Sequence, residues 1–133
     1  MKALFADTFY YLALLNPADE AHGRAVTASR RLVGPTVTTA WGLTEVADAL
    51  ADPANKPAFL ALMERLRTNP NVTIVPPSHD LFRAGMVLYG QRLDKGWSLT
   101  DCISFVVMRD RGLTDALTND RHFAQAGFNL LLG

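Results

Sequence analysis

Three aspartates stand at the borders of buried segments, and their carboxylates are the groups of this sequence best placed to do chemistry. Asp7 follows the apolar run 2–6, and Asp120 follows a short run of strand character at 116–118. Asp101 lies in the first turn of a predicted apolar helix. The end of a buried parallel strand is also where open α/β sheets place their ligands, which applies to Asp7. A charge is costly to bury without a partner, so these positions require an explanation.

Helix capping is the simplest explanation for two of these carboxylates. The segment Ser98-Leu99-Thr100-Asp101 fits a capping box, in which the acid reaches back to the cap residue and is favoured by the helix dipole. Asp120 can equally be an N-cap or a first-turn acid. Such caps are common and contribute only about 1 kcal/mol each. Other features of the sequence are therefore needed to distinguish capping from a functional site.

Short strands and helices alternate along the chain. Strands are predicted at 2–6, 36–38, 72–75, 116–118 and 128–132, and helices at about 8–15, 17–32, 39–51, 54–67, 78–95 and 98–112, with another helix opening at 118–120. This alternation predicts an α/β fold with a central parallel sheet of four to five short strands and helices on both faces. We expect a single domain over residues 1–133, because no linker, repeat or low-complexity segment interrupts the pattern.

Composition narrows the possible functions. Thirteen basic and thirteen acidic residues give a formal net charge of zero, so nucleic-acid binding would have to be local or metal-assisted. Cys102 is the only cysteine, which excludes internal disulfides and cysteine metal sites, and we expect it to be a small core residue. Neither a signal peptide nor a membrane span is predicted. We therefore expect a soluble, cytoplasmic protein.

The order of the acids along the chain resembles the PIN-domain family of ribonucleases. The matching segments are FADTFYY with Asp7, LTEVADAL with Glu45, SLTDCISF with Asp101 and TNDRHF with Asp120. The likeness covers essentially the whole chain, and it is closest to the VapC-type toxins of toxin–antitoxin pairs. Helical periodicity alone would have placed Glu45 on the solvent side of its helix, together with Asp48 and Asp52.

The resemblance implies a PIN-like three-layer sandwich and an endoribonuclease with four catalytic acids. Asp7, Asp101 and Asp120 would bind the metal, and Glu45 would bind it through water or position the attacking water. Carboxylates that converge at one sheet edge repel one another unless a cation lies between them, and oxygen ligands suit Mg²⁺ or Mn²⁺. Such a site can activate water for in-line displacement at a phosphodiester.

The same resemblance implies three partners: an RNA substrate, a cognate antitoxin protein and a second copy of the chain. Apolar residues on the polar early helices, at Leu32, Leu60 and Met63, favour a homodimer there. A PIN fold kept as a protein-binding module with little or no nuclease activity is the alternative, although all four acids are retained. A receiver-like or phosphatase-like protein is a weaker match, because the D-x-D motif of aspartate phosphatases is missing.

The three histidines carry no ligand spacing. His22, His79 and His122 are far apart in sequence and stand on polar stretches, so we expect them at the surface. His122 nevertheless lies close to the proposed site, in the segment TNDRHF.

Overall fold

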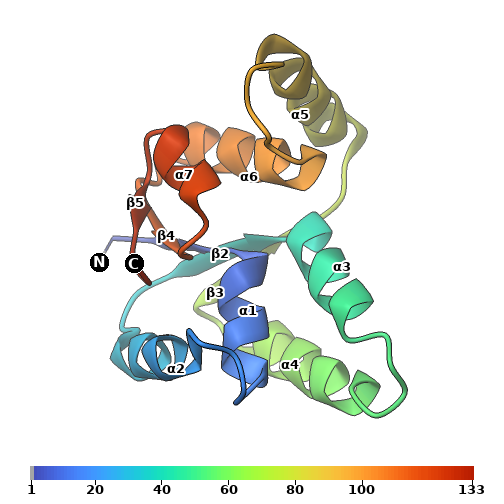
Figure 1. Cartoon of the computed structure of the whole chain (residues 1–133), viewed down its shortest axis with the longest axis vertical. Coiled ribbons are helices and arrows are strands. Elements are labelled where there is room, and N and C mark those ends of the chain that lie inside the picture. Colours follow the sequence, from blue (N-terminus) through green and yellow to red (C-terminus); the bar gives the residue numbers. More distant parts are fainter. Residues whose placement is uncertain (1) are drawn as a thin grey trace.

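The computed structural model describes residues 2–133 and contains a five-stranded sheet flanked by helices (Figure 1). The strands are β1 (Leu4–Ala6), β2 (Thr36–Thr39), β3 (Val72–Val75), β4 (Asp115–Leu117) and β5 (Asn129–Leu130). The helices are α1 (Thr8–Leu15), α2 (His22–Arg31), α3 (Ala40–Ala49), α4 (Lys56–Thr68), α5 (His79–Gln91), α6 (Leu99–Asp110) and α7 (Arg121–Gln125).

All five strands pair in parallel, in the order β3-β2-β1-β4-β5. The chain builds the sheet in one direction from β1 to β3, then returns to place β4 on the other side of β1. The strand order therefore reverses between β1 and β4. The carboxyl ends of the strands at such a switch point form the crevice where open α/β sheets bind ligands. Asp7 stands at this point, directly after β1, and its backbone N–H donates to Leu117 O at the end of β4 over 3.4 Å.

Helices cover both faces of the sheet, as the alternating pattern predicts. In Figure 1, α1 to α4 lie on one side and α5 to α7 on the other. The first group packs on a core that includes Tyr10, Leu43 and Leu62, and the second on a core built around Phe105 and Phe123. The predicted α/β class and layered architecture are confirmed. Among residues 2–133, no helix is long and apolar enough to cross a membrane.

A close approach between α5 and α6 fixes the helix that carries Asp101. A Cβ added at Gly85 of α5 would lie 2.4 Å from Ile103 Cγ1 of α6, too close for the two helices to keep this spacing. Gly90, on the same helix, has no atom within 4 Å of its added Cβ. Glycine is thus required at position 85 by contact with α6, and position 90 has room for a side chain.

The segment before α2 differs from the prediction of a helix over 17–32. Residues 17–21 form turns, because Asn16 Oδ1 accepts from Ala18 N over 3.0 Å and Asp19 Oδ1 accepts from Ala21 N over 2.8 Å. Side-chain bonds of this kind compete with the helical pattern. At the other end of the chain, β5 has two residues instead of five. The backbone beyond it still follows β4, with Leu132 N donating to Thr118 O over 3.1 Å.

Candidate active site

Asp7 is the most buried acid of the site, with 7% of its surface exposed. Its Oδ2 accepts a hydrogen bond from Thr118 Oγ1 over 2.8 Å and a longer one from Phe9 N over 3.4 Å. Burial raises the pKa of Asp7 to about 7 despite the Thr118 bond, and the nearby charges of Asp101 and Asp120 raise it further. The protein thus holds a carboxylate whose charge its own hydrogen bonds do not compensate.

Asp101 caps α6 and also faces the site. Ser98 Oγ accepts from Asp101 N over 3.0 Å, and Asp101 Oδ2 accepts from Ser98 N over 3.1 Å, which completes the predicted capping box. The same Oδ2 lies 3.0 Å from Nδ1 of His122. The pKa of Asp101 is raised, first by burial and further by the charge of Asp120. Capping and a role in the site are therefore compatible for this residue.

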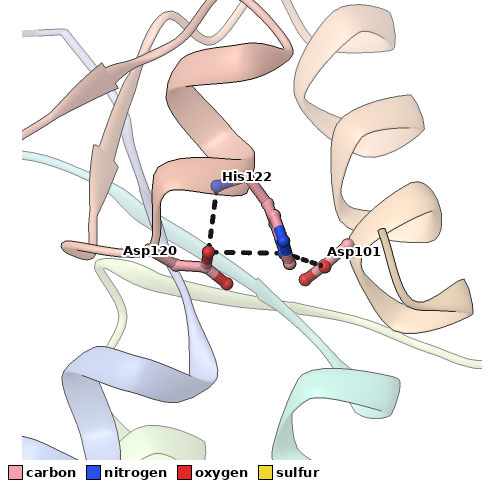
Figure 2. A group of neighbouring side chains, drawn as sticks. All are labelled: Asp101, Asp120 and His122. Atoms are coloured by element: carbon pink, nitrogen blue, oxygen red, sulfur yellow. Dashed lines mark hydrogen bonds and ion pairs between the residues drawn. The ribbon is translucent and has the colours of Figure 1, made fainter. Parts of the chain in front are cut away.

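Asp120 is the N-cap of α7, which sets its carboxylate beside that of Asp101. Its Oδ1 accepts from His122 N over 2.9 Å and lies 3.4 Å from His122 Nδ1. Figure 2 shows the His122 ring between the carboxylates of Asp101 and Asp120. One side-chain ligand atom from each of these three residues lies within 4.8 Å of the other two. The backbone N–H of Asp120 donates to Thr118 Oγ1 over 3.0 Å, so Thr118 links Asp120 to Asp7.

Glu45 contacts Thr8, the first residue of α1, which directly follows Asp7. The Thr8 hydroxyl lies 2.9 Å from Glu45 Oε1 and 3.1 Å from Gly42 O. Glu45 is only half-exposed, so the placement on the solvent side that periodicity gave was wrong. The physical reason is that the start of α1 packs against this side of α3, a contact between distant segments. Asp48 and Asp52, which share that side of the helical wheel, are exposed as expected.

The structure corrects the surface assignment of His22 and His122 and supports the expectation for Cys102. His122 is not a free surface residue, because its ring contacts two acids of the site. His22 is half-buried and its Nδ1 lies 2.8 Å from Ala13 O, whereas His79 is exposed as expected. Cys102 is fully buried in the core beneath Asp101, and burial raises the pKa of its thiol. A thiol with a raised pKa is a poor nucleophile, which agrees with a packing role.

Several solved structures share this fold, and VapC20 and FitAcB are two of them. VapC20 of Mycobacterium tuberculosis, a sarcin-ricin loop cleaving toxin, matches with a TM-score of 0.85 and 26% identity over 94% of this chain and 95% of that chain. The chain has the fold of a VapC-type PIN-domain protein. FitAcB from Neisseria gonorrhoeae matches in fold, with a TM-score of 0.67 and 20% identity over 96% of this chain and 95% of that one. No known family model and no curated protein matches the sequence.

The donor set at this edge of the VapC-type fold suits a hard divalent cation. Asp7, Asp101 and Asp120 offer carboxylate oxygens, and the raised pKa values of Asp7 and Asp101 reflect burial and mutual repulsion. A cation between these groups would relieve both costs. Among residues 2–133, the group of side chains close enough together to hold a metal consists of Asp101, Asp120 and the nitrogen of His122, a residue that sequence patterns had not indicated. Asp7 and Glu45, which were also predicted for the site, lie outside this group.

Proposed function

We propose that the protein is a divalent-metal-dependent endoribonuclease that acts as the toxin of a toxin–antitoxin pair. The observation that carries the proposal is the convergence of Asp7, Asp101 and Asp120 beside the β1–β4 switch point of a VapC-type fold. A purely structural set of acids would not need three carboxylates close enough for two of them to raise the pKa of the third. The alternative, a PIN fold kept only for protein binding, does not explain why these three carboxylates lie close together.

Each residue has a distinct role in this proposal. Asp7, Asp101 and Asp120 hold the cation, and Mg²⁺ and Mn²⁺ are the ions that such oxygens prefer. Glu45, held by Thr8, positions the attacking water or binds the cation through water. A bound divalent cation lowers the pKa of water and stabilises the negative charge that develops on the phosphodiester. Thr118 orients Asp7 by donating to its Oδ2.

The proposed RNA substrate follows from the VapC20 likeness. VapC20 cleaves the sarcin-ricin loop, so a hairpin with that loop is the first RNA to try on this chain. The zero net charge of the chain means that RNA binding depends on the site itself and on nearby basic groups. Arg121 is one such group, since it is exposed and directly follows Asp120.

The proposed protein partners are an antitoxin and a second copy of the chain. The expected dimer surface on α2 and α4 is weak, because Leu32 and Met63 are half-buried against the core and only Leu60 is exposed. A better surface lies on α5, where Phe82, Met86 and Tyr89 share one exposed side. We propose that two chains pair through this side of α5.

The activity can be tested on a purified, metal-depleted protein with the sarcin-ricin hairpin and an unrelated structured RNA. The proposal predicts cleavage after addition of Mg²⁺ or Mn²⁺, none in a chelator, and none by Asp120→Asn. The control variant Asp48→Asn, altered at an exposed position outside the site, retains cleavage. RNA cutting that survives the chelator or the Asp120 variant contradicts the proposal.

A further inference from the structure

His122 is the one non-carboxylate side chain in the group that could hold a metal. Its backbone N–H donates to Asp120 Oδ1 over 2.9 Å, which fixes the residue at the start of α7. Its ring turns Nδ1 toward the site, 3.0 Å from Asp101 Oδ2 and 3.4 Å from Asp120 Oδ1 (Figure 2). The side chain is 35% exposed, so solvent ions can reach it.

A hydrogen bond from Nδ1 cannot satisfy both of the carboxylates that it faces. Nδ1 carries at most one hydrogen, so it can make one good bond to a carboxylate and only a strained second one. A cation among the three groups could contact all of them. Ligands about 2.0–2.3 Å from one ion are at most about 4.6 Å apart, and the three ligand atoms here lie within 4.8 Å of one another. A small side-chain adjustment would therefore bring all three into one coordination shell.

We propose that His122 is a nitrogen ligand of the metal site and biases that site toward Mn²⁺ over Mg²⁺. The inference rests on the proposed metal-dependent function, and adds a ligand and a metal preference to it. Imidazole suits transition-metal ions, whereas Mg²⁺ takes oxygen ligands almost throughout. A site of carboxylates alone would distinguish the two ions less. The nitrogen donor therefore favours Mn²⁺ over Mg²⁺ at this site.

The same contacts also have an alternative explanation, in which His122 is not a metal ligand. In that alternative, the ring only fills the space between two carboxylates and must leave before an ion can bind. The two possibilities predict opposite effects of removing the ring. Loss of a ligand weakens Mn²⁺ binding, whereas loss of an obstructing ring strengthens the binding of both ions.

The test measures metal binding by calorimetry and nitrogen coordination by pulsed electron paramagnetic resonance of the Mn²⁺-loaded protein. The proteins are the wild type, His122→Ala, His122→Phe and the control His79→Ala, which alters an exposed histidine on α5. The phenylalanine variant keeps a ring of similar size, and circular dichroism checks the fold of each protein.

The proposal predicts ¹⁴N coupling to Mn²⁺ in the wild type and in His79→Ala, and none in either His122 variant. Both His122 variants lose at least about tenfold in Mn²⁺ affinity, while Mg²⁺ affinity changes by less than about threefold. Missing ¹⁴N coupling in the wild type, or unchanged or tighter Mn²⁺ binding in the variants, overturns the proposal. Mg²⁺-dependent RNA cleavage by the variants would show that the proposed function survives such a failure. A wild type that binds neither ion overturns both.

Discussion

The replacement of Asp7 by asparagine tests whether the site carries an uncompensated charge in the absence of metal. Asparagine has nearly the same shape, and its Oδ1 can still accept the hydrogen bond from Thr118 Oγ1. It cannot ionise. The variant therefore removes the buried charge and leaves the packing at the end of β1 in place. We expect the metal-free Asp7→Asn protein to be more stable than the wild type at neutral and alkaline pH.

The size of the effect follows from the pKa of Asp7. Burial raises this pKa from 3.8 to about 7, so between these values the folded protein holds a proton that the unfolded chain has lost. The free energy of unfolding of the wild type therefore falls as pH rises through this window. At about 1.36 kcal/mol per pKa unit, the wild type has lost about 4 kcal/mol of stability near pH 8 and about 2 kcal/mol at pH 5. The advantage of the asparagine variant thus grows by about 2–3 kcal/mol between pH 5 and pH 8.

Urea denaturation of metal-depleted protein at pH 5 and pH 8 measures this difference. Asp48→Asn is the matched control, because Asp48 is exposed and its replacement leaves the site unchanged. Addition of Mg²⁺ at pH 8 stabilises the wild type by mass action and the Asp7 variant much less. A variant that is less stable than the wild type by the same amount at both pH values would refute the reasoning, since it would show that the protein already compensates the Asp7 charge.

Three further outcomes follow from the same contacts. Asp101→Asn keeps an acceptor for the Ser98 N–H and removes a repelled charge, so its melting temperature in chelator, measured by calorimetry, is no lower than that of the wild type. The variant loses most of the stabilisation that Mg²⁺ gives the wild type. A lower melting temperature with an intact Mg²⁺ response would show that Asp101 is only a cap. Thr8→Ala frees the Glu45 carboxylate and lowers the RNA cleavage rate about tenfold, whereas Thr8→Ser retains it; equal rates would separate Glu45 from the reaction. Gly85→Ala lowers the free energy of unfolding, measured by urea denaturation, by about 1–3 kcal/mol because the added methyl group meets α6. Gly90→Ala raises the same free energy by about 0.5–1 kcal/mol. Equal effects of the two variants would contradict the close packing of α5 and α6.

Local sequence patterns were sufficient for the elements that position the acids. The capping box from Ser98 to Asp101 and the N-cap at Asp120 are interactions within a few residues, and both are present. Asp7 was predictable because a buried strand precedes it and a helix follows it directly. The parallel sheet followed from alternation of short strands and helices.

Contacts between distant segments were outside the reach of those patterns. The bond from Thr8 to Glu45 joins residues 37 positions apart, and helical periodicity, which treats α3 alone, had assigned Glu45 to solvent. His122 and Asp101 are 21 positions apart, and no ligand spacing relates them. The position of His122 two residues after an N-cap acid at a helix start was the one local sign that its ring could turn toward the site.

The most direct test of the account is the position of a bound metal ion in a crystal. Crystals equilibrated with Mn²⁺ at a concentration that supports RNA cleavage give anomalous scattering from each ion. A metal-dependent site predicts a peak at the carboxyl ends of β1 and β4, in contact with the carboxylates of Asp7, Asp101 and Asp120. Cleavage-competent conditions that leave this position without a peak, or that place the ion elsewhere on the protein, would contradict it.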